Sequence, residues 1–110
     1  MVWQRAHRFV LEIYGLTSTF PLEERYGLTS QLRRAAASVP ANIVEGFRRS
    51  TVRERVRFYN IAQASADECV YHLILAHDLG FSDTLKLQQE LDELSRMLYN
   101  YIEGHFRENR

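Results

Sequence analysis

Apolar side chains recur at intervals of three and four residues in four segments of this chain, a spacing that is typical of amphipathic α-helices. The pattern predicts helices over residues 2–18, 28–47, 52–78 and 83–106. With two prolines and five glycines among 110 residues, the chain has little capacity for the many tight turns of an all-β fold. We therefore expect an all-α protein, an antiparallel up-down four-helix bundle in which residues 1–110 form a single domain.

Local sequence signals mark where the expected helices begin and end. Thr51, with a glutamate three residues later, matches a capping box at the start of the third helix, and Gly80 is expected to end that helix in a left-handed conformation. Ser82 is expected to cap the fourth helix. Pro40 lies inside the second helix, where it removes a backbone donor, so we expect a bend there and a bond from Asn42 to the backbone group that Pro40 leaves free.

Charge is unevenly distributed along the chain, although the formal net charge is zero. Residues 1–57 hold ten arginines and five acidic residues, whereas residues 58–110 hold four basic and nine acidic residues. Because the guanidinium fork suits bidentate contact with phosphate, the arginine-rich half predicts a nucleic-acid interface. The residues assigned to that interface are Arg33, Arg34, Arg48, Arg49, Arg53 and Arg57.

The same arginines have a second interpretation. Arginines on helices often form a solvated face or pair with carboxylates, and the acidic half of this chain offers such partners within one subunit or between subunits. Charge distribution alone leaves nucleic-acid binding and ion pairing as equal alternatives.

The third expected helix is apolar on more than one side. Such a helix must be covered on several sides, either by the other three helices or by a second copy of the chain. We therefore expect a homo-oligomer whose interface includes Phe58, Ile61, Cys69 and His72.

Candidate catalytic and metal-ligating residues do not form a recognisable set. Cys69 is the single cysteine, which excludes an internal disulfide, and it lies on an apolar helical face where a thiol is usually inert. Glu68 and His72 are one helical turn apart, but the paired Glu-x-x-His motifs of dinuclear bundles are absent. No arginine precedes a histidine by the spacing that HEPN ribonucleases use. We expect no enzyme activity, no cofactor and no metal.

The chain also lacks the sequence features of a membrane or secreted protein. No apolar run approaches the ~20 residues that a membrane span requires, and charged residues interrupt the first sixteen positions. A cytoplasmic location is therefore expected.

Three motifs carry a resemblance to a known family. They are SVPANIVEG at residues 38–46, RFYNIA at 57–62 and AHDLG at 76–80. Together with residues around Trp3 and the approach to Gly27, they make residues 3–80 resemble the four-helix-bundle proteins encoded by 23S rRNA intervening sequences. That family includes the accessory variability determinant protein of diversity-generating retroelements. The resemblance implies a homopentamer with a basic surface, and the retroelement protein is a non-enzymatic partner of nucleic acid and of a reverse transcriptase.

Two functions follow as hypotheses. The first is a non-enzymatic homo-oligomeric scaffold that binds RNA or another polyanion through its arginine-rich face. The alternative is a protein-protein interaction subunit with no nucleic-acid role, in which apolar and aromatic side chains make the contacts.

Overall fold

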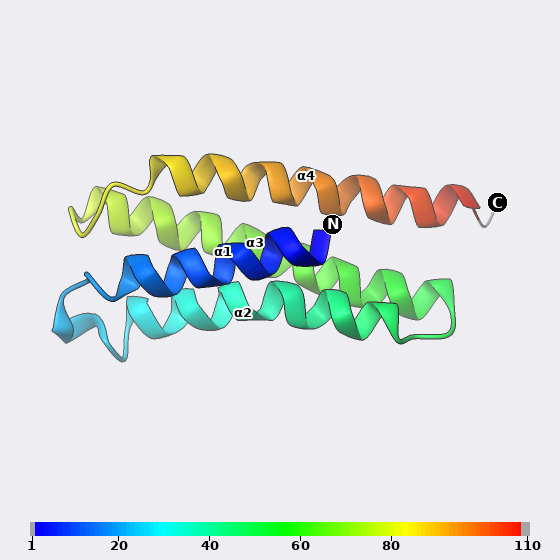
Figure 1. Cartoon of the computed structure of the whole chain (residues 1–110), viewed down its shortest axis with the longest axis horizontal. Coiled ribbons are helices and arrows are strands. Elements are labelled where there is room, and N and C mark those ends of the chain that lie inside the picture. The colour runs from blue at the N-terminus through cyan, green and yellow to red at the C-terminus, as the bar shows by residue number, and fades with distance from the viewer. Residues whose placement is uncertain (1, 109–110) are drawn as a thin grey trace.

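Four helices form the molecule in a computed structural model, which describes residues 2–108. They are α1 (Val2–Thr17), α2 (Leu28–Phe47), α3 (Val52–Asp78) and α4 (Leu85–Glu108), with a short 3-10 turn, η1 (Leu22–Glu24), before α2. Successive helices run in opposite directions, and the bundle measures 49 × 22 × 18 Å (Figure 1). The predicted all-α four-helix bundle is confirmed.

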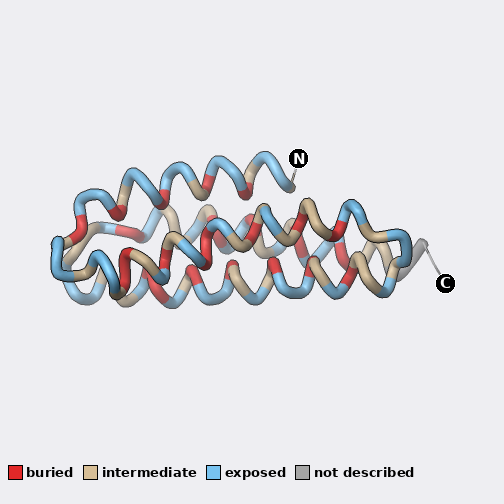
Figure 2. Tube along the Cα trace, turned by 90° about the horizontal axis from the view of Figure 1, so that it is seen from below, coloured by how far each residue is buried: buried red, intermediate tan, exposed pale blue. Residues whose placement is uncertain are grey.

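The helices pack as a bundle in which α3 lies beside both α2 and α4, whereas α1 lies beside α2 and, to a smaller extent, α4. Buried residues line the inward side of each helix, as Figure 2 shows. The core is built from aliphatic and small side chains, among them Ile13, Leu32, Ile43, Leu73 and Leu91. The small residues Ala36, Ala62 and Ala66 are fully buried, which lets neighbouring helices approach closely.

The four helices differ in length, and this difference shapes one end of the molecule. α1 has 16 residues, whereas α3 has 27 and α4 has 24. The N-terminal end of α1 therefore lies beside the middle of the bundle, and α2, α3 and α4 continue past it without α1 (Figure 1). None of the helices within residues 2–108 is long and apolar enough to cross a membrane.

Helix boundaries confirm most of the local predictions and correct two. Thr51 Oγ1 accepts the Glu54 N–H at 3.2 Å, and Gly80 has φ = 79° after the end of α3. Ser82 does not cap α4, because the helix begins at Leu85 and Thr84 precedes it. The Thr84 side chain is buried and donates to the Leu73 carbonyl at 2.6 Å, which ties the start of α4 to α3.

The second correction concerns Pro40. α2 runs as one helix through this residue, but Asn42 does not reach the carbonyl of Ala36 that Pro40 leaves unpaired. Its Nδ2 donates instead to the carbonyl and hydroxyl oxygens of Ser38, at 2.8 and 2.9 Å. The Ser65 hydroxyl of α3 donates to the Ser38 hydroxyl at 2.8 Å. Asn42 thus belongs to a polar link between α2 and α3.

Candidate nucleic-acid interface

One glycine allows the end of α2 to pack closely against α3. Gly46 is buried in the last turn of α2, and a Cβ atom at this position would overlap the Tyr59 ring of α3. Tyr59 is 1% exposed, so its ring fills the space that a side chain at position 46 would need. The last residue of the SVPANIVEG motif therefore has a packing role, and it brings the arginines of both helices to one end of the bundle. We call residues 45–58 the arginine corner.

Two arginines hold the backbone of the arginine corner in place. Arg49 pairs with Glu45 at 2.6 Å and also donates to the Glu45 carbonyl. Arg55 Nε donates to the Arg49 carbonyl at 2.8 Å, which joins the first turn of α3 to the segment before it. Glu45 thus has an arginine of the same bend, Arg49, as its partner. These contacts stabilise the turn and reduce the charge that Arg49 presents to a ligand.

The Phe58 ring contacts two arginines of the corner, Arg49 and Arg57. The guanidinium carbons of Arg49 and Arg57 lie 5.3 and 5.2 Å from the ring centroid, within the range of cation–π contacts. Arg57 also pairs with Glu54 at 3.4 Å in an exposed position. Both arginines are thereby oriented on the surface of the bundle.

The side chains of two arginines of the corner have no partner among the described residues. Arg48 and Arg53 are exposed, and neither side chain makes a hydrogen bond or salt bridge with any residue within the described part of the chain. The corner holds five arginines and only two glutamates, Glu45 and Glu54, so its formal charge is positive. This is the type of surface that attracts phosphate groups.

Arg33 and Arg34 do not belong to this corner. Arg33 and Arg48 are fifteen positions apart along α2, which corresponds to about 22 Å along the helix axis. The six assigned arginines therefore lie in two groups, one at each end of α2. The reason is the length of α2, a continuous helix whose two ends point to opposite ends of the bundle (Figure 1).

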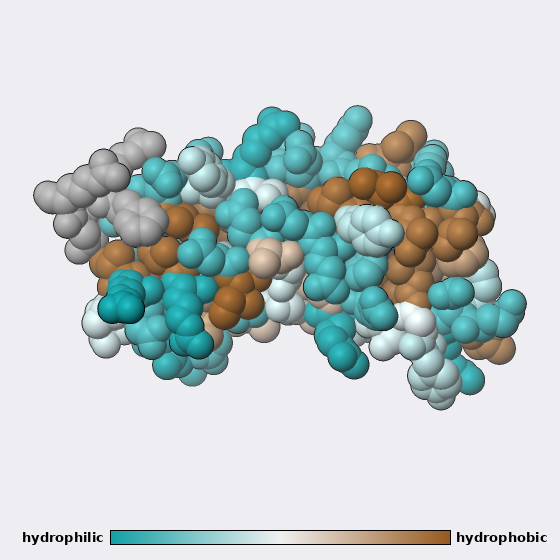
Figure 3. Space-filling model, turned by 180° about the vertical axis from the view of Figure 1, so that it is seen from behind, coloured by the Kyte–Doolittle hydropathy of each residue, from teal (hydrophilic) through white to brown (hydrophobic). Residues whose placement is uncertain are grey.

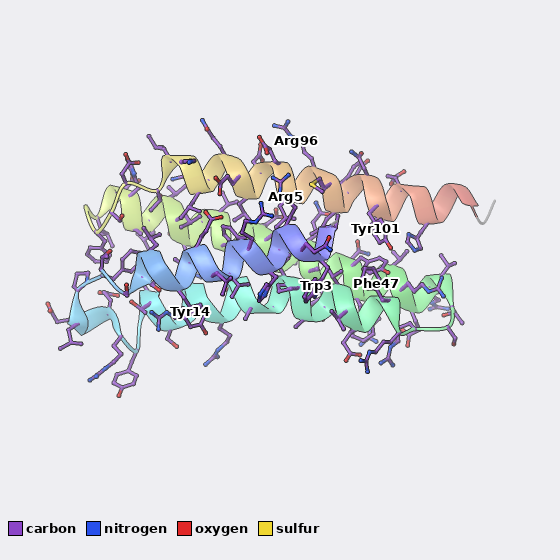
Figure 4. The ribbon with its side chains drawn as sticks, viewed as in Figure 1. Trp3, Arg5, Tyr14, Phe47, Arg96 and Tyr101 are labelled. Carbon is purple, nitrogen blue, oxygen red and sulfur yellow. The ribbon has the colours of Figure 1, made fainter. Side chains whose placement is uncertain are left out.

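An aromatic cluster lies beside the arginine corner, in the part of the bundle to which α1 does not extend. Phe47 and Tyr101 face each other from α2 and α4 (Figure 4), with ring centroids 6.2 Å apart, and both contact Tyr59. Phe47 is 48% exposed and Tyr101 is 36% exposed. Burial raises the pKa of Tyr59, and its hydrogen bond with Tyr101 adds to the effect. Phe47 and Tyr101 continue the apolar periodicity of their helices, and only the shortness of α1 could have indicated that they are exposed.

The predicted interface residues of α3 occupy different environments. Ile61 is 39% exposed and Phe58 is half-buried, so both offer some surface to a second copy. Cys69 is fully buried in the core of its own chain, and His72 is 8% exposed. The side chain of Cys69 has no surface left with which to contact another subunit, so its assignment to an interface does not fit the fold.

The remaining reactive side chains are isolated or paired locally. Burial raises the pKa of the Cys69 thiol to about 12, with the Glu68 carboxylate as a second cause, which keeps the sulfur protonated. His72 Nε2 lies 3.1 Å from Glu68, and its Nδ1 is buried without a partner. Within residues 2–108 no three histidine, cysteine or acidic side chains gather in a way that could hold a metal ion.

Comparison with known proteins adds the family. The model of the 23S rRNA-intervening sequence protein family matches residues 1–100 of this sequence. The chain belongs to this family. Its fold resembles the crystal structure of a protein of unknown function from the S23 ribosomal protein family of Bacteroides thetaiotaomicron, with a TM-score of 0.84 and 22% sequence identity over 93% of this chain and 98% of that chain. A search of curated proteins found no match. At this identity the likeness concerns the fold alone.

Proposed function

We propose that this member of the 23S rRNA-intervening sequence protein family is a non-enzymatic, cytoplasmic homo-oligomer that binds RNA or another polyanion at the arginine corner. One observation carries the proposal. Arg48 and Arg53 are exposed and unpaired within the described chain, on a surface where arginines outnumber acidic residues. Neutralising phosphates with such groups releases counterions, which favours binding.

The aromatic cluster supports RNA over a featureless polyanion. Phe47 and Tyr101 expose part of their rings next to the arginines, and unpaired bases stack on exposed aromatic rings. A single-stranded region of RNA offers both phosphates and bases to this surface. Since the family is named for 23S rRNA intervening sequences, a single-stranded fragment of 23S rRNA is the first probe to test.

The experiment is a salt titration of RNA binding. Replacing both Arg48 and Arg53 with alanine removes two phosphate contacts and leaves the contacts that hold the corner in place. The slope of log K against log salt is negative, and its magnitude should decrease by about 1.4 for a single strand. The matched control is Arg8→Ala on α1, which removes an exposed arginine outside the corner. Salt-insensitive RNA binding, or equal losses in the double variant and the control, would contradict the proposal.

Two apolar surfaces on different faces support self-association. One is a groove of about 490 Å³ between α1 and α2, lined by Trp3, Val10, Pro40 and Val44 among others. The other lies on the opposite face, where hydrophobic residues gather toward the α3–α4 connection (Figure 3). Ile74, which lies in the last turns of α3 before that connection, is 39% exposed. Contacts between two different faces of identical chains generate a ring where the rotation between subunits closes, as it does in the pentamer that the family resemblance implies.

The solution mass tests self-association directly. A pentamer would have five times the 13.0 kDa mass of one chain by light scattering. Ile74→Asp should shift the mass toward that of the monomer, because it places a charge in the apolar surface. A monodisperse monomer for the unaltered chain would remove the oligomer from the proposal.

The α1–α2 groove also favours the alternative function, a protein-protein interaction subunit. Trp3 is 37% exposed at its rim, and tryptophan is enriched at the energetic centres of interfaces. In that case a partner protein should stay bound at high salt and be lost in Trp3→Ala, while Arg48→Ala leaves it bound.

A further inference from the structure

A small pocket lies at the end of α2 remote from the arginine corner. It has a volume of about 360 Å³, near the lower limit of the ~300 Å³ to 1,000 Å³ that small-molecule sites occupy. α1, the turn after η1 and the first turns of α2 form its walls, and Tyr14 marks its position in Figure 4. We call it the tyrosine–arginine pocket, and its walls include Tyr14, Arg25, Tyr26, Thr29, Arg33 and Arg34.

The pocket is positively charged, and one of its charges is held in place. Arg33 Nε donates to the Thr17 hydroxyl at 2.7 Å, its Nη2 donates to the Tyr14 carbonyl at 3.3 Å, and its guanidinium lies 4.5 Å from the centroid of the Tyr14 ring. Arg34 is exposed and has no ion pair with a described residue. No acidic side chain lines the pocket. The nearby Glu24 carboxylate accepts the Leu28 N–H at 3.1 Å and is engaged at the start of α2.

Unpaired donors face the same pocket from the first turn of α2. Thr29 is 8% exposed, yet its hydroxyl makes no hydrogen bond with any residue that the structure describes. The hydroxyl of the neighbouring Ser30, which also lines the pocket, is likewise unpaired within residues 2–108. The backbone N–H groups of both residues belong to the helix start, where amides have no acceptor inside the helix and favour anions. Thr29 is thus a largely buried residue whose hydroxyl lines the pocket and is available to a ligand atom.

An exposed aromatic ring completes the pocket. Tyr26 is 85% exposed, and the Arg25 guanidinium lies 4.9 Å from its centroid. A tyrosine ring this open to solvent offers a face on which a nucleobase can stack. Phosphate-binding donors and a stacking surface thus lie within one small cavity.

We propose that the tyrosine–arginine pocket binds a nucleotide phosphate. The phosphate is held by the Arg34 guanidinium and by the hydroxyl and N–H donors of Thr29 and Ser30, while the base stacks on Tyr26. The pre-positioned Arg33 contributes a fixed positive charge. A free mononucleotide and the phosphorylated end of a single strand carry the same chemistry. The site is separate from the arginine corner, so it does not depend on polyanion binding there.

The test is a calorimetric titration with adenosine 5′-monophosphate, inorganic phosphate and a short oligonucleotide with or without a 5′-phosphate. The unaltered protein should bind the mononucleotide with a Kd below ~1 mM. Arg34→Ala should weaken binding about tenfold, since a charge-assisted hydrogen bond is lost. Tyr26→Ala should weaken mononucleotide binding but leave inorganic phosphate unchanged. Tighter binding of the 5′-phosphorylated strand than of the mononucleotide assigns the pocket to strand ends, and equal binding assigns it to free nucleotides.

The double variant with alanine at Arg48 and Arg53 is the control, because it removes charge at the other end of α2. It should lose RNA affinity and keep mononucleotide affinity. Circular dichroism verifies that each variant is folded. The proposed pocket would be overturned if the unaltered protein did not bind the mononucleotide, or if Arg34→Ala and Tyr26→Ala both bound it as tightly as the unaltered protein does. Either result would leave the proposal for the arginine corner intact.

Discussion

The two ends of α2 carry arginines of the same kind in different surroundings. At the arginine corner, Arg49 and Arg57 pair with glutamates, and Arg48 and Arg53 are unpaired within the described chain. At the tyrosine–arginine pocket, Arg33 is held by a hydroxyl, a carbonyl and an aromatic ring, with no carboxylate partner. The comparison teaches that an arginine's contacts, and not its position in a charged segment, decide whether it supports the fold or remains available to a ligand.

The largest expected effect tests the packing that creates the arginine corner. Gly46→Ala should lower the free energy of unfolding by about 3 kcal/mol, because the new Cβ overlaps the Tyr59 ring and the core must shift. Urea denaturation followed by circular dichroism measures it. The control is Gly104→Ala in α4, where nothing lies within 4 Å of the added atom, and this variant should be more stable by up to about 1 kcal/mol. Similar results for both glycines would show that Tyr59 does not pack against Gly46.

The next effect concerns the end of α2 at the tyrosine–arginine pocket. Arg33→Ala should destabilise the fold by about 1.5 kcal/mol, since the side chain donates to Thr17 and stacks on Tyr14. Arg34→Ala, one position along the chain, should change stability by less than about 0.5 kcal/mol. Thermal unfolding of both variants distinguishes an arginine that supports the fold from one that remains available to a ligand. An equal loss in Arg34→Ala would mean that Arg34 also supports the fold.

A smaller effect is expected for the matching pair at the arginine corner. Arg49→Ala should cost about 1 kcal/mol, because it removes a half-exposed ion pair with Glu45 and a bond to its carbonyl. Arg48→Ala should be neutral within about 0.5 kcal/mol. The difference in stability between the variants should shrink in 1 M salt, because the Debye length there is roughly 3 Å and the ion pair is screened. A difference that is constant with salt would assign the effect of Arg49 to packing on Phe58.

The smallest effect extends the comparison to the acidic residues at the seam between α1 and α4. Burial, followed by a hydrogen bond and charge repulsion from Glu90, raises the pKa of Glu12. A raised pKa in the folded state means that the contribution of Glu12 to stability is present at low pH and is lost as pH rises through that value. Glu12→Gln should therefore stabilise the protein at pH 7 by about 0.5 kcal/mol and have little effect near pH 4. Denaturation at the two pH values measures this, and a destabilised variant at pH 7 would contradict it.

Much of the fold could be predicted from the amino-acid sequence. The four helices, the cap at Thr51 and the left-handed Gly80 follow from local spacing and backbone preference, and the structure has them where they were expected. The start of α4 could not be read in the same way. Ser82 has the chemistry of a cap, but the buried Thr84 is selected by its bond to Leu73 on another helix. Such long-range partners leave no local pattern.

The candidate interface was only partly predictable. Counting charges located an arginine-rich half, and four of the six assigned residues, Arg48, Arg49, Arg53 and Arg57, do lie at one bend. The split between the two ends of α2 could have been derived from helix length alone, whereas the exposure of Phe47 and the unpaired hydroxyl of Thr29 could not. Both depend on which neighbouring element covers the side chain.

By itself, the amino-acid sequence determined the helical class, the number of helices and the family, because periodicity and short motifs are properties of neighbouring positions. Tertiary structure alone decided which arginines are engaged, that Cys69 is interior, and that α1 leaves an aromatic surface open. The physical reason is that burial and pairing depend on groups distant in the chain, whose approach is fixed only when the helices pack.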